Sequence, residues 1–212
     1  MTYPVEDSIF GPIFSGEVLT QATLVTLKEW FPTYIHEIEL QRGWTPKQIP
    51  PPRTYVERWH FDTYPDEQLP IVVAVCPGMA EPPRTDGDGT MSGWWSLGIG
   101  VIAAANVEKN SERMAKVYGA AARAIIEQKS YLDNSWDFDG VQVLDESYQD
   151  VPDMEQSRTM RSAQVVCRIH VMNIMNRFAG PAYPDVPDPS QPGAIWPDVQ
   201  EVFIDIERLE EE

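Results

Sequence analysis

Three histidines and one serine are the side chains of this 212-residue chain that come nearest to supporting catalysis or metal binding. His36, His60 and His170 lie far apart in the sequence and show none of the short spacings that bring two ligands to one metal ion. Ser96 lies in GWWSLG, which differs from the G-x-S-x-G sequence that holds a hydrolase nucleophile at a strand-to-helix turn. We therefore predict neither a metal site nor a nucleophilic serine.

Residues 86–89 (DGDG) have the composition of a calcium-binding loop. Such a loop needs further oxygen ligands at alternating positions and a glutamate at its twelfth, and residues 90–92 (TMS) do not continue that pattern. Gly87, Gly89 and Gly93 also lack the following Lys-Ser/Thr pair of a phosphate-binding loop. We interpret the run as a tight turn, and we expect no catalytic, cofactor-binding or metal-binding residues in the chain.

The cysteines, the amino terminus and the longest apolar run all favour synthesis in the cytosol. Cys76 and Cys167 lie in apolar, strand-like runs without CxxC spacing, so we expect two buried free thiols. The first ten residues, MTYPVEDSIF, fit neither a secretory signal nor an arginine-rich transit peptide. The apolar run at 97–105 is far shorter than the roughly 20 residues that cross a bilayer, so no membrane partner is expected.

The formal net charge of −17 is unevenly distributed along the chain. Residues 181–212 hold nine acidic residues and one arginine, and therefore carry −8 of the total. Because lysine and arginine supply most of the attraction to phosphate backbones, this composition disfavours nucleic-acid binding. Two interpretations stay open: the charge serves solubility, or it forms a wall past which DNA slides as passing cargo.

Hydrophobic spacing predicts two helices. The first covers 16–42 and carries an apolar stripe, with a kink or a break expected near Trp30 because Pro32 interrupts it and a stop expected at Gly43. The second covers 107–129, with Asn106 or Asn110 as N-cap. Its small residues are expected to lie against the glycine and alanine surface of the strand before it. The stripe of the first helix is Leu24, Leu27, Phe31, Tyr34 and Ile38, and the small flank of the second is Ala115, Gly119 and Ala122.

Runs of β-branched and alternating residues predict the strands. An edge strand is expected within 54–63, a central strand at 69–76, a long strand at 94–105, a short strand at 141–147 and a last long strand at 160–178. Between Cys76 and Trp94, prolines and glycines are expected to prevent any regular element.

This order of elements predicts an α+β fold with a mixed or antiparallel sheet of about four or five strands and helices packed on one face. We divide the chain into an N-terminal extension at 1–15, a core domain at 16–178 and an acidic, proline-rich C-terminal arm at 179–212. The arm is too polar to fold alone and should be extended. It ends in the alternating segment EVFIDIERL, which needs a sheet edge from its own subunit or from a neighbour.

Two loops and the arm are the predicted contact surfaces. The loops cover 81–93 and 134–140. For Arg84 we expect an intersubunit or tube-facing charge pair, with a solvated loop charge as the alternative. Trp196 either anchors an interface or folds back over its own core. The interface candidates are Arg84, Asp86, Asp88, Trp136, Asp137, Trp196, Phe203 and Ile204.

Several short blocks together resemble the tail terminator proteins of long-tailed (siphovirus-type) phages, particularly those that infect actinobacteria. The blocks are LKEWFPTYIHEIELQRG, LPIVVAVCPG, PPRTDGDG followed by WWSLGIGVI, VYGAAARAII, VQVLDESY and AQVVCRIHV. They span about residues 16–178 and form a pattern of elements, not a catalytic signature. The resemblance implies an α/β fold and assembly as a hexameric ring. The arm after Ala179 departs from the family core, so its partner stays open.

The resemblance also implies partners and a location. Such a ring caps the head-proximal end of the tail tube, halts tube growth and presents the surface for head–tail joining. Its partners would be other copies of the chain, the major tail tube protein and the head–tail connector or stopper protein. The chain would assemble in the host cytoplasm and reside in the virion, at the neck-proximal end of the tail. The alternatives are a stopper or adaptor protein of the neck and, more remotely, a small cytosolic enzyme with a deep polar pocket.

Overall fold

The computed structural model describes residues 14–57, 66–86, 89–105, 108–128, 138–151 and 159–176. Within them lie two α-helices, α1 (Gly16–Gln41) and α2 (Glu108–Gln128), and a short 3-10 helix, η2 (Asp66–Gln68). Six strands complete the description: β1 (Thr54–Val56), β2 (Ile71–Met79), β3 (Arg84–Thr85), β4 (Thr90–Ala105), β5 (Phe138–Val151) and β6 (Thr159–Asn176). The predicted division at residues 15/16 and 178/179 stays a prediction.

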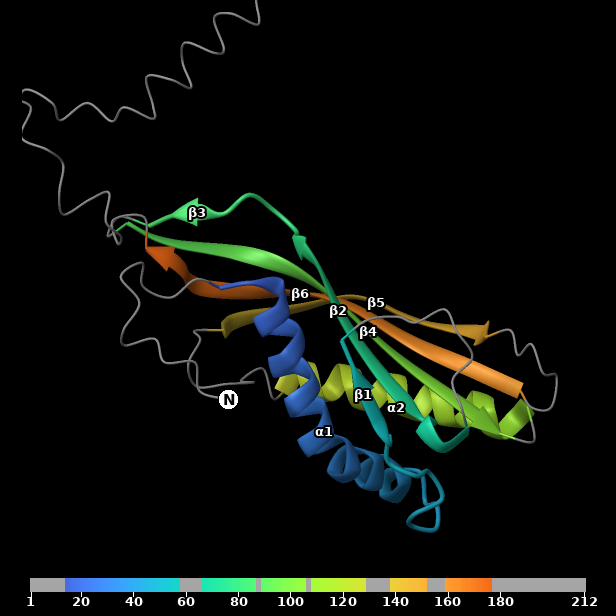
Figure 1. Ribbon diagram of the computed structural model, residues 1–212. Helices are drawn as coiled ribbons and strands as arrows, with labels where there is room; N and C mark the ends of the chain where they lie inside the picture. The colour runs from blue at the N-terminus through green and yellow to red at the C-terminus, as the bar shows by residue number, and fades with distance from the viewer. Residues whose placement is uncertain are drawn as a thin grey trace, which may run out of the picture.

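The six strands form one mixed sheet in the order β1-β2-β4-β6-β5, with β3 beside the start of β4. β1 runs parallel to β2, and the other pairs are antiparallel. Figure 1 shows both α-helices on the same side of the sheet. The predicted α+β class is therefore confirmed, and the strand beyond the expected four or five is the two-residue β3.

The helix α1 is continuous through Pro32, where the sequence predicted a kink or two helices. Its axis changes direction partway along its length (Figure 1), and the missing N–H of an interior proline is an ordinary cause of such a bend. At its start, the side chain of Ser15 accepts a hydrogen bond from a backbone N–H of the first turn. At its end, Gly43 has a φ of 65°, which is the helix stop expected from the sequence.

The buried stripe of α1 shifts after the proline. Before it, Leu24, Leu27 and Phe31 are buried as predicted. After it, Tyr34 and Ile38 are only half-buried, and the buried positions are Ile35 and Glu39. The 3.6-residue period therefore does not continue unchanged through the bend.

The helix α2 buries the predicted faces and packs on β6 and β5 as well as on the predicted β4. Asn110 lies inside the helix, so it is not the N-cap, and Asn106 lies outside the described residues. A Cβ at Gly119 would lie 3.1 Å from Tyr148 and 3.2 Å from Ala163, on β5 and β6. The small flank of α2 thus permits a close approach to these two strands, and not chiefly to β4 as predicted.

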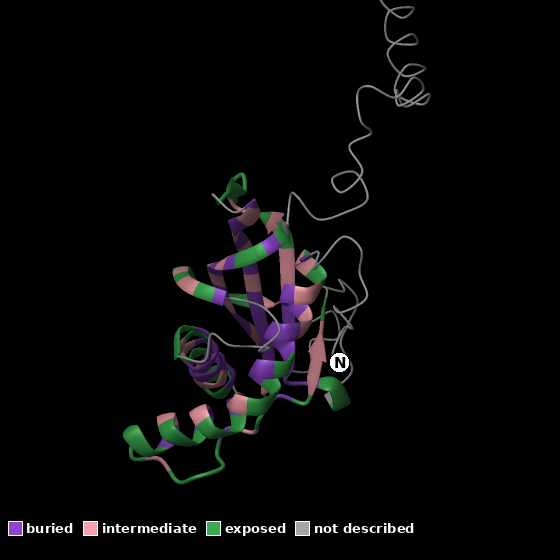
Figure 2. Cartoon of the chain, turned by 90° about the vertical axis from the view of Figure 1, so that its left-hand side faces the viewer, coloured by how far each residue is buried: buried purple, intermediate pink, exposed green. Residues whose placement is uncertain are grey.

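Each face of the sheet carries its own apolar cluster. Alternate residues of β2 and β4, such as Val72 and Leu97, pack with the helices into the main core, where Figure 2 shows many of the buried residues. The intervening residues point to the opposite face and form a second buried cluster. Its members are Leu69, Ile71, Val73, Ile102 and Met160.

Two strand predictions need correction. Regular structure persists between residues 76 and 94, because β2 continues to Met79, β3 forms at Arg84 and Thr85, and β4 already begins at Thr90. β5 has 14 residues, where a short strand was predicted at 141–147. The edge strand expected at 54–63 exists as the three-residue β1, and residues 58–65 lie outside the described residues.

Candidate assembly surface

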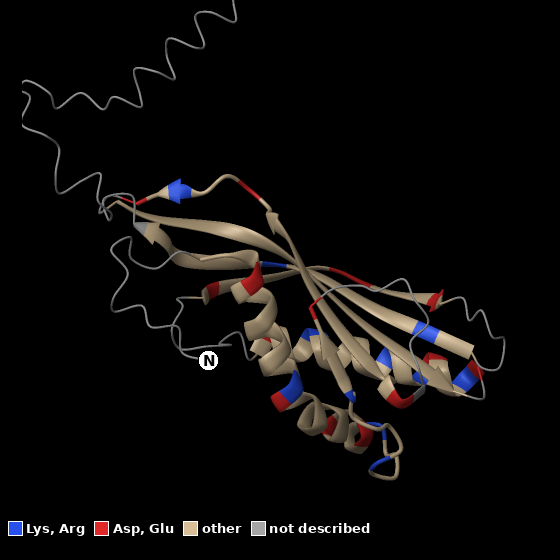
Figure 3. Cartoon of the chain, in the orientation of Figure 1, with Lys and Arg blue, Asp and Glu red and all other residues tan. Residues whose placement is uncertain are grey.

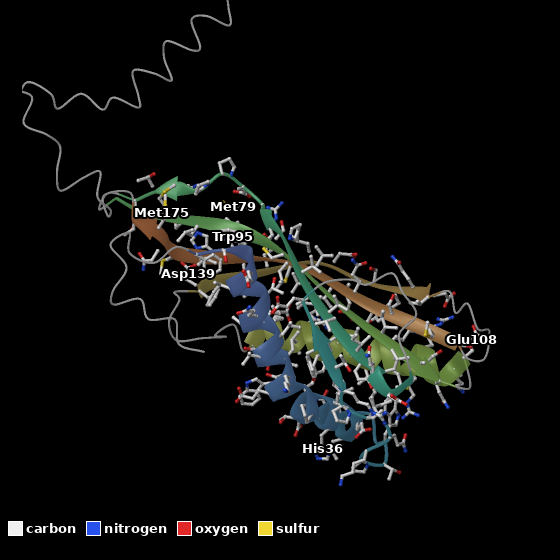
Figure 4. The ribbon with its side chains drawn as sticks, viewed as in Figure 1. His36, Met79, Trp95, Glu108, Asp139 and Met175 are labelled. Carbon is white, nitrogen blue, oxygen red and sulfur yellow. The ribbon has the colours of Figure 1, made fainter. Side chains whose placement is uncertain are left out.

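One end of the sheet extends beyond both helices. Figure 1 shows β3, the start of β4 and the end of β6 continuing past α1. We call this region, made of residues 77–86, 89–96 and 168–176, the projecting end. Met79 and Met175 lie on it (Figure 4). Several of its side chains still belong to the main core, namely Trp95, Ile169, Val171 and Ile174, whereas Met79, Met172 and Met175 are partly exposed.

Backbone hydrogen bonds hold the projecting end in extended form. The N–H of Ala80 donates to the carbonyl of Trp94 (2.7 Å), and the N–H of Asp86 donates to the carbonyl of Thr90 (2.7 Å). Gly89 closes the turn between β3 and β4 with a φ of 87°, a conformation that glycine adopts without strain. The loop predicted from its prolines and glycines is therefore a hairpin that pairs with the main sheet. This supports the interpretation of residues 86–89 as a tight turn.

Three methionines expose apolar surface there. The exposed fractions are 37% for Met79, 37% for Met172 and 39% for Met175, and Met175 stands opposite Met91 in the register of β4 and β6. Methionine is flexible and polarizable, and it is frequent at surfaces that bind other proteins. Exposed methionines on a rigid strand framework are therefore suited to contact a partner.

Charged and polar groups accompany these methionines. Arg84 and Asp86 are exposed, and within the described part of the chain Arg84 has no ion-pair partner. Arg168 on β6 reaches across β4 to Glu81, with Nη1 3.0 Å from Oε1. Both side chains of this pair are partly exposed, so it contributes at most about 1 kcal/mol to stability.

Next to them, His170 contacts Asp139, and its ring lies 5.0 Å from that of Trp94 between centroids. The neighbouring Trp95 points to the other face, where it is 8% exposed and packs edge-on against Phe14 at 5.1 Å. This confirms the prediction that at least one of the two tryptophans belongs to the core.

The two free cysteines are poor nucleophiles. Burial raises the pKa of the Cys167 thiol to about 12. Burial also raises the pKa of Cys76, which is half-buried and accounts for the tight space around Gly16. Both thiols are therefore largely protonated at neutral pH, as expected for cysteines that serve packing.

No group of three potential metal ligands occurs in the ranges that the structure describes. In those same ranges, neither helix is long and apolar enough to cross a membrane. His36 and His170 lie on different elements, α1 and β6, and His60 lies outside the described residues.

Of the predicted interface residues, the structure places Arg84 and Asp86 together on the β3–β4 hairpin. The other six lie outside the described residues, so their predictions stay untested: Asp88, Trp136, Asp137, Trp196, Phe203 and Ile204. Sequence reasoning missed the exposed methionines. The available signal was that Met172 and Met175 lie close together near the predicted carboxyl end of the last strand, where core packing ends.

Comparison with solved structures gives distant likenesses, among them the following. A chain from the virion of a native gene transfer agent (GTA) particle matches with a TM-score of 0.39 and 18% sequence identity, over 57% of this chain and 78% of that chain. A TM-score this low does not establish a shared fold. No family model and no curated protein matches the chain.

Proposed function

We propose that this chain is a structural protein of a phage-type virion, acting as a ring that caps the head-proximal end of the tail tube. In this role copies of the chain join as a closed hexamer, stop tube polymerisation and offer the surface for head–tail joining. The observation that carries the proposal is the projecting end. It is ordered by strand pairing, yet it exposes Met79, Met172 and Met175 and carries Arg84, which has no ion-pair partner among the described residues.

A projecting strand framework with apolar side chains suits assembly for an energetic reason. Exposed apolar surface gives no folding energy to the subunit, but its burial between subunits stabilises a complex by about 25 cal/mol per Å². The sequence blocks that resemble tail terminators favour a phage tail as the setting. The charge of −17 per subunit would keep DNA from adhering to the ring as it passes.

Termination of this kind requires binding and no chemistry. One face of the ring would reproduce the contact that the major tail tube protein makes with itself, so the ring docks on the tube. The other face would not accept another tube ring and would instead contact the connector or stopper protein. Growth then stops because the two surfaces do not match.

Assembly of the purified protein tests the proposal. We expect light scattering and negative-stain images to show closed rings, and we expect Met79→Ser with Met175→Ser to weaken the rings or their binding to tube protein. Val25→Ser is the matched control, because Val25 is a 61% exposed apolar residue on α1, outside the projecting end.

Two outcomes would contradict the proposal. One is a protein that stays monomeric both alone and with tube protein. The other is a tail of unchanged length and head attachment in phage that lack the chain.

A further inference from the structure

The segment that joins α1 to β1 is basic, although the chain as a whole is acidic. Residues 42–53 (RGWTPKQIPPPR) contain three cations and no carboxylate. Figure 3 shows lysine and arginine in this connection, at the end of the molecule away from β3. Neither the fold nor the proposed capping role accounts for a local excess of positive charge.

Two arginines stack on one tryptophan in this segment. The guanidinium carbon of Arg113 lies 3.3 Å from the ring centroid of Trp44, and that of Arg42 lies 5.0 Å away. Arg113 comes from α2 and also donates to Gln48 Oε1 at 2.8 Å. Stacking on an aromatic ring orders the arginines and leaves their charge uncompensated.

Hydrogen bonds to side chains of α1 and α2 fix the backbone of the segment. Glu39 is 1% exposed, and its carboxylate accepts hydrogen bonds from the N–H groups of Lys47 (2.8 Å) and Ile49 (2.7 Å). The hydroxyl of Tyr118 donates to the carbonyl of Pro50. The only carboxylate bonded to this segment is thus committed to its backbone, as far as the described residues show.

The exposed cations therefore have no carboxylate partner in the described chain. Arg42, Lys47 and Arg53 are exposed, and none of the ion pairs formed among the described residues includes them or Arg113. We call Arg42, Trp44, Lys47, Arg53 and Arg113 the basic patch.

We propose that the basic patch binds the acidic C-terminal segment, residues 201–212, of a neighbouring copy of this chain. That segment holds six carboxylates and one arginine, so its formal charge of −5 complements the patch. It also carries Phe203 and Ile204, apolar side chains that suit the surface of Trp44. The proposal rests on the capping role in one respect, the presence of a neighbouring copy.

The positions of the two features favour a neighbour over the same subunit. β6 ends at Asn176 on the projecting end, whereas the basic patch lies at the other end of the molecule (Figures 1 and 4). The intervening residues 177–200 include six prolines, a composition that favours an extended linker, which at about 3.1 Å per residue is long enough to reach a neighbouring copy. A contact from one end of a subunit to the opposite end of the next is head-to-tail, which is the type of contact that closes rings.

A complementation experiment with full-length variants tests this contact. One variant, Arg42→Glu with Lys47→Glu, keeps the tail and loses the patch. The other, with Glu207, Glu210, Glu211 and Glu212 each changed to Gln, keeps the patch and lowers the formal charge of residues 201–212 from −5 to −1; we call it the tail-neutralised variant. We expect each alone to associate at least tenfold more weakly than the wild type by light scattering, and an equimolar mixture to form one-to-one heterodimers. Lys28→Glu, a single charge reversal on α1 outside the basic patch, should associate as the wild type does.

A labelled peptide of residues 201–212 gives an independent readout. It should bind the tail-neutralised variant with an affinity that falls as salt rises, and Arg42→Glu with Lys47→Glu in that background should weaken binding at least tenfold while Lys28→Glu does not. Unchanged urea midpoints would show that the variants are folded.

Several results would overturn the proposal. In the complementation experiment, these are rings that persist in both variants, a mixture of the variants that does not associate, or a wild-type tail that binds only its own subunit. In the peptide experiment, it is a basic patch that binds short duplex DNA and does not bind the peptide. Persisting rings would leave the capping role intact. If the variants complement each other but phage tail length does not change, the capping role is wrong and the contact between copies still holds.

Discussion

The helix-covered core and the projecting end are parts of one sheet, yet they treat apolar side chains in opposite ways. Beneath α1 and α2, residues such as Phe31 and Tyr118 are 0% exposed and in ring contact with each other at 6.3 Å. Past the helices, Met79 and Met175 keep more than a third of their surface in contact with solvent. The same strands, β4 and β6, pass through both regions.

This difference distinguishes the apolar side chains that stabilise the folded subunit from those that contribute little to its stability. Burial in the core stabilises the monomer, because each buried apolar side chain leaves water on folding. The projecting end keeps Met79, Met172 and Met175 partly exposed, and under the proposed function a partner subunit covers them. Substitutions that compare the two regions can break or sharpen that distinction.

The largest expected effect is a core truncation. Phe31→Ala should lower the free energy of unfolding by about 3–5 kcal/mol, because it removes a fully buried ring and leaves a cavity. Met175→Ala should change it by less than about 1 kcal/mol, because Met175 is already partly solvated. Urea denaturation followed by tryptophan fluorescence measures both.

For ring assembly, we expect the substitution at Met175 to have the clearer effect. Met175→Ala should reduce ring formation at concentrations where it remains folded. If Met175→Ala proves as destabilising as Phe31→Ala, the projecting end is part of the folding core and the distinction fails.

A buried carboxylate should give the next largest effect. Glu39→Ala removes the acceptor for the N–H groups of Lys47 and Ile49, and leaves the buried N–H of Ile49 without a partner. We expect a loss of about 2–3 kcal/mol. Glu37→Ala is the control, since Glu37 is exposed on the same helix and should change stability by less than about 0.5 kcal/mol. Equal losses for the two variants would contradict the role given to Glu39.

Alkaline pH should weaken the core through Cys167. Its pKa rises from an ordinary value of 9.0 to about 12 on folding, so the folded state holds its proton over a range where the unfolded state releases it. The contribution is fully present below pH 9 and is lost as pH rises toward 12, with a loss on the order of 1 kcal/mol between pH 8 and pH 10. Burial also raises the pKa of Tyr118, which extends the loss to higher pH.

The measurement is the urea midpoint at pH 7, 8, 9 and 10. Cys167→Ala should lower the urea midpoint at every pH. Above pH 8, the midpoint of this variant should fall less steeply with pH than that of the wild type. Cys76→Ala should flatten it less, because Cys76 is only half-buried. A decline of the same steepness in Cys167→Ala would show that other groups carry the alkaline sensitivity.

The sequence predicted the elements wherever burial imposes a period. β2, β4, β6 and both helices follow runs of apolar residues that face the core, and their limits fall within a few residues of the predicted ones. The prediction failed where strands are not buried. β3 was hidden by the surrounding prolines and glycines, and the outer half of β5 is polar because it forms a solvent-exposed edge.

The candidate surface was less predictable for a related reason. Arg84 and Asp86 could be identified as loop charges, because polar residues beside glycines indicate exposure. Met175 lies in an apolar strand, and composition assigns such a methionine to the core, whereas Met79 lies in the stretch that was predicted to lack regular structure. Their exposure depends on how far the sheet extends past the helices, which is a property of the tertiary arrangement that no local pattern encodes.

The smallest expected effect compares two glycines, one in each region. A Cβ at Gly119 would lie 3.2 Å from the Cβ of Ala163 and 3.1 Å from the ring of Tyr148, so α2 would have to move away from the sheet. The strain of overpacking, about 1–3 kcal/mol, exceeds the roughly 1 kcal/mol by which alanine favours a helix over glycine. Gly119→Ala should therefore destabilise the protein by about 1 kcal/mol.

Gly93 in β4 looks tighter by distance, because a Cβ there would lie 2.8 Å from the terminal methyl of Met79. That methyl is the free end of a flexible, partly exposed side chain, so it can turn away at little cost. We expect Gly93→Ala to change the urea midpoint by the equivalent of less than about 0.5 kcal/mol. The shorter distance should thus give the smaller loss, because the rigidity of the neighbour decides the cost. A Gly93→Ala protein less stable than Gly119→Ala would mean that the projecting end is packed as firmly as the core.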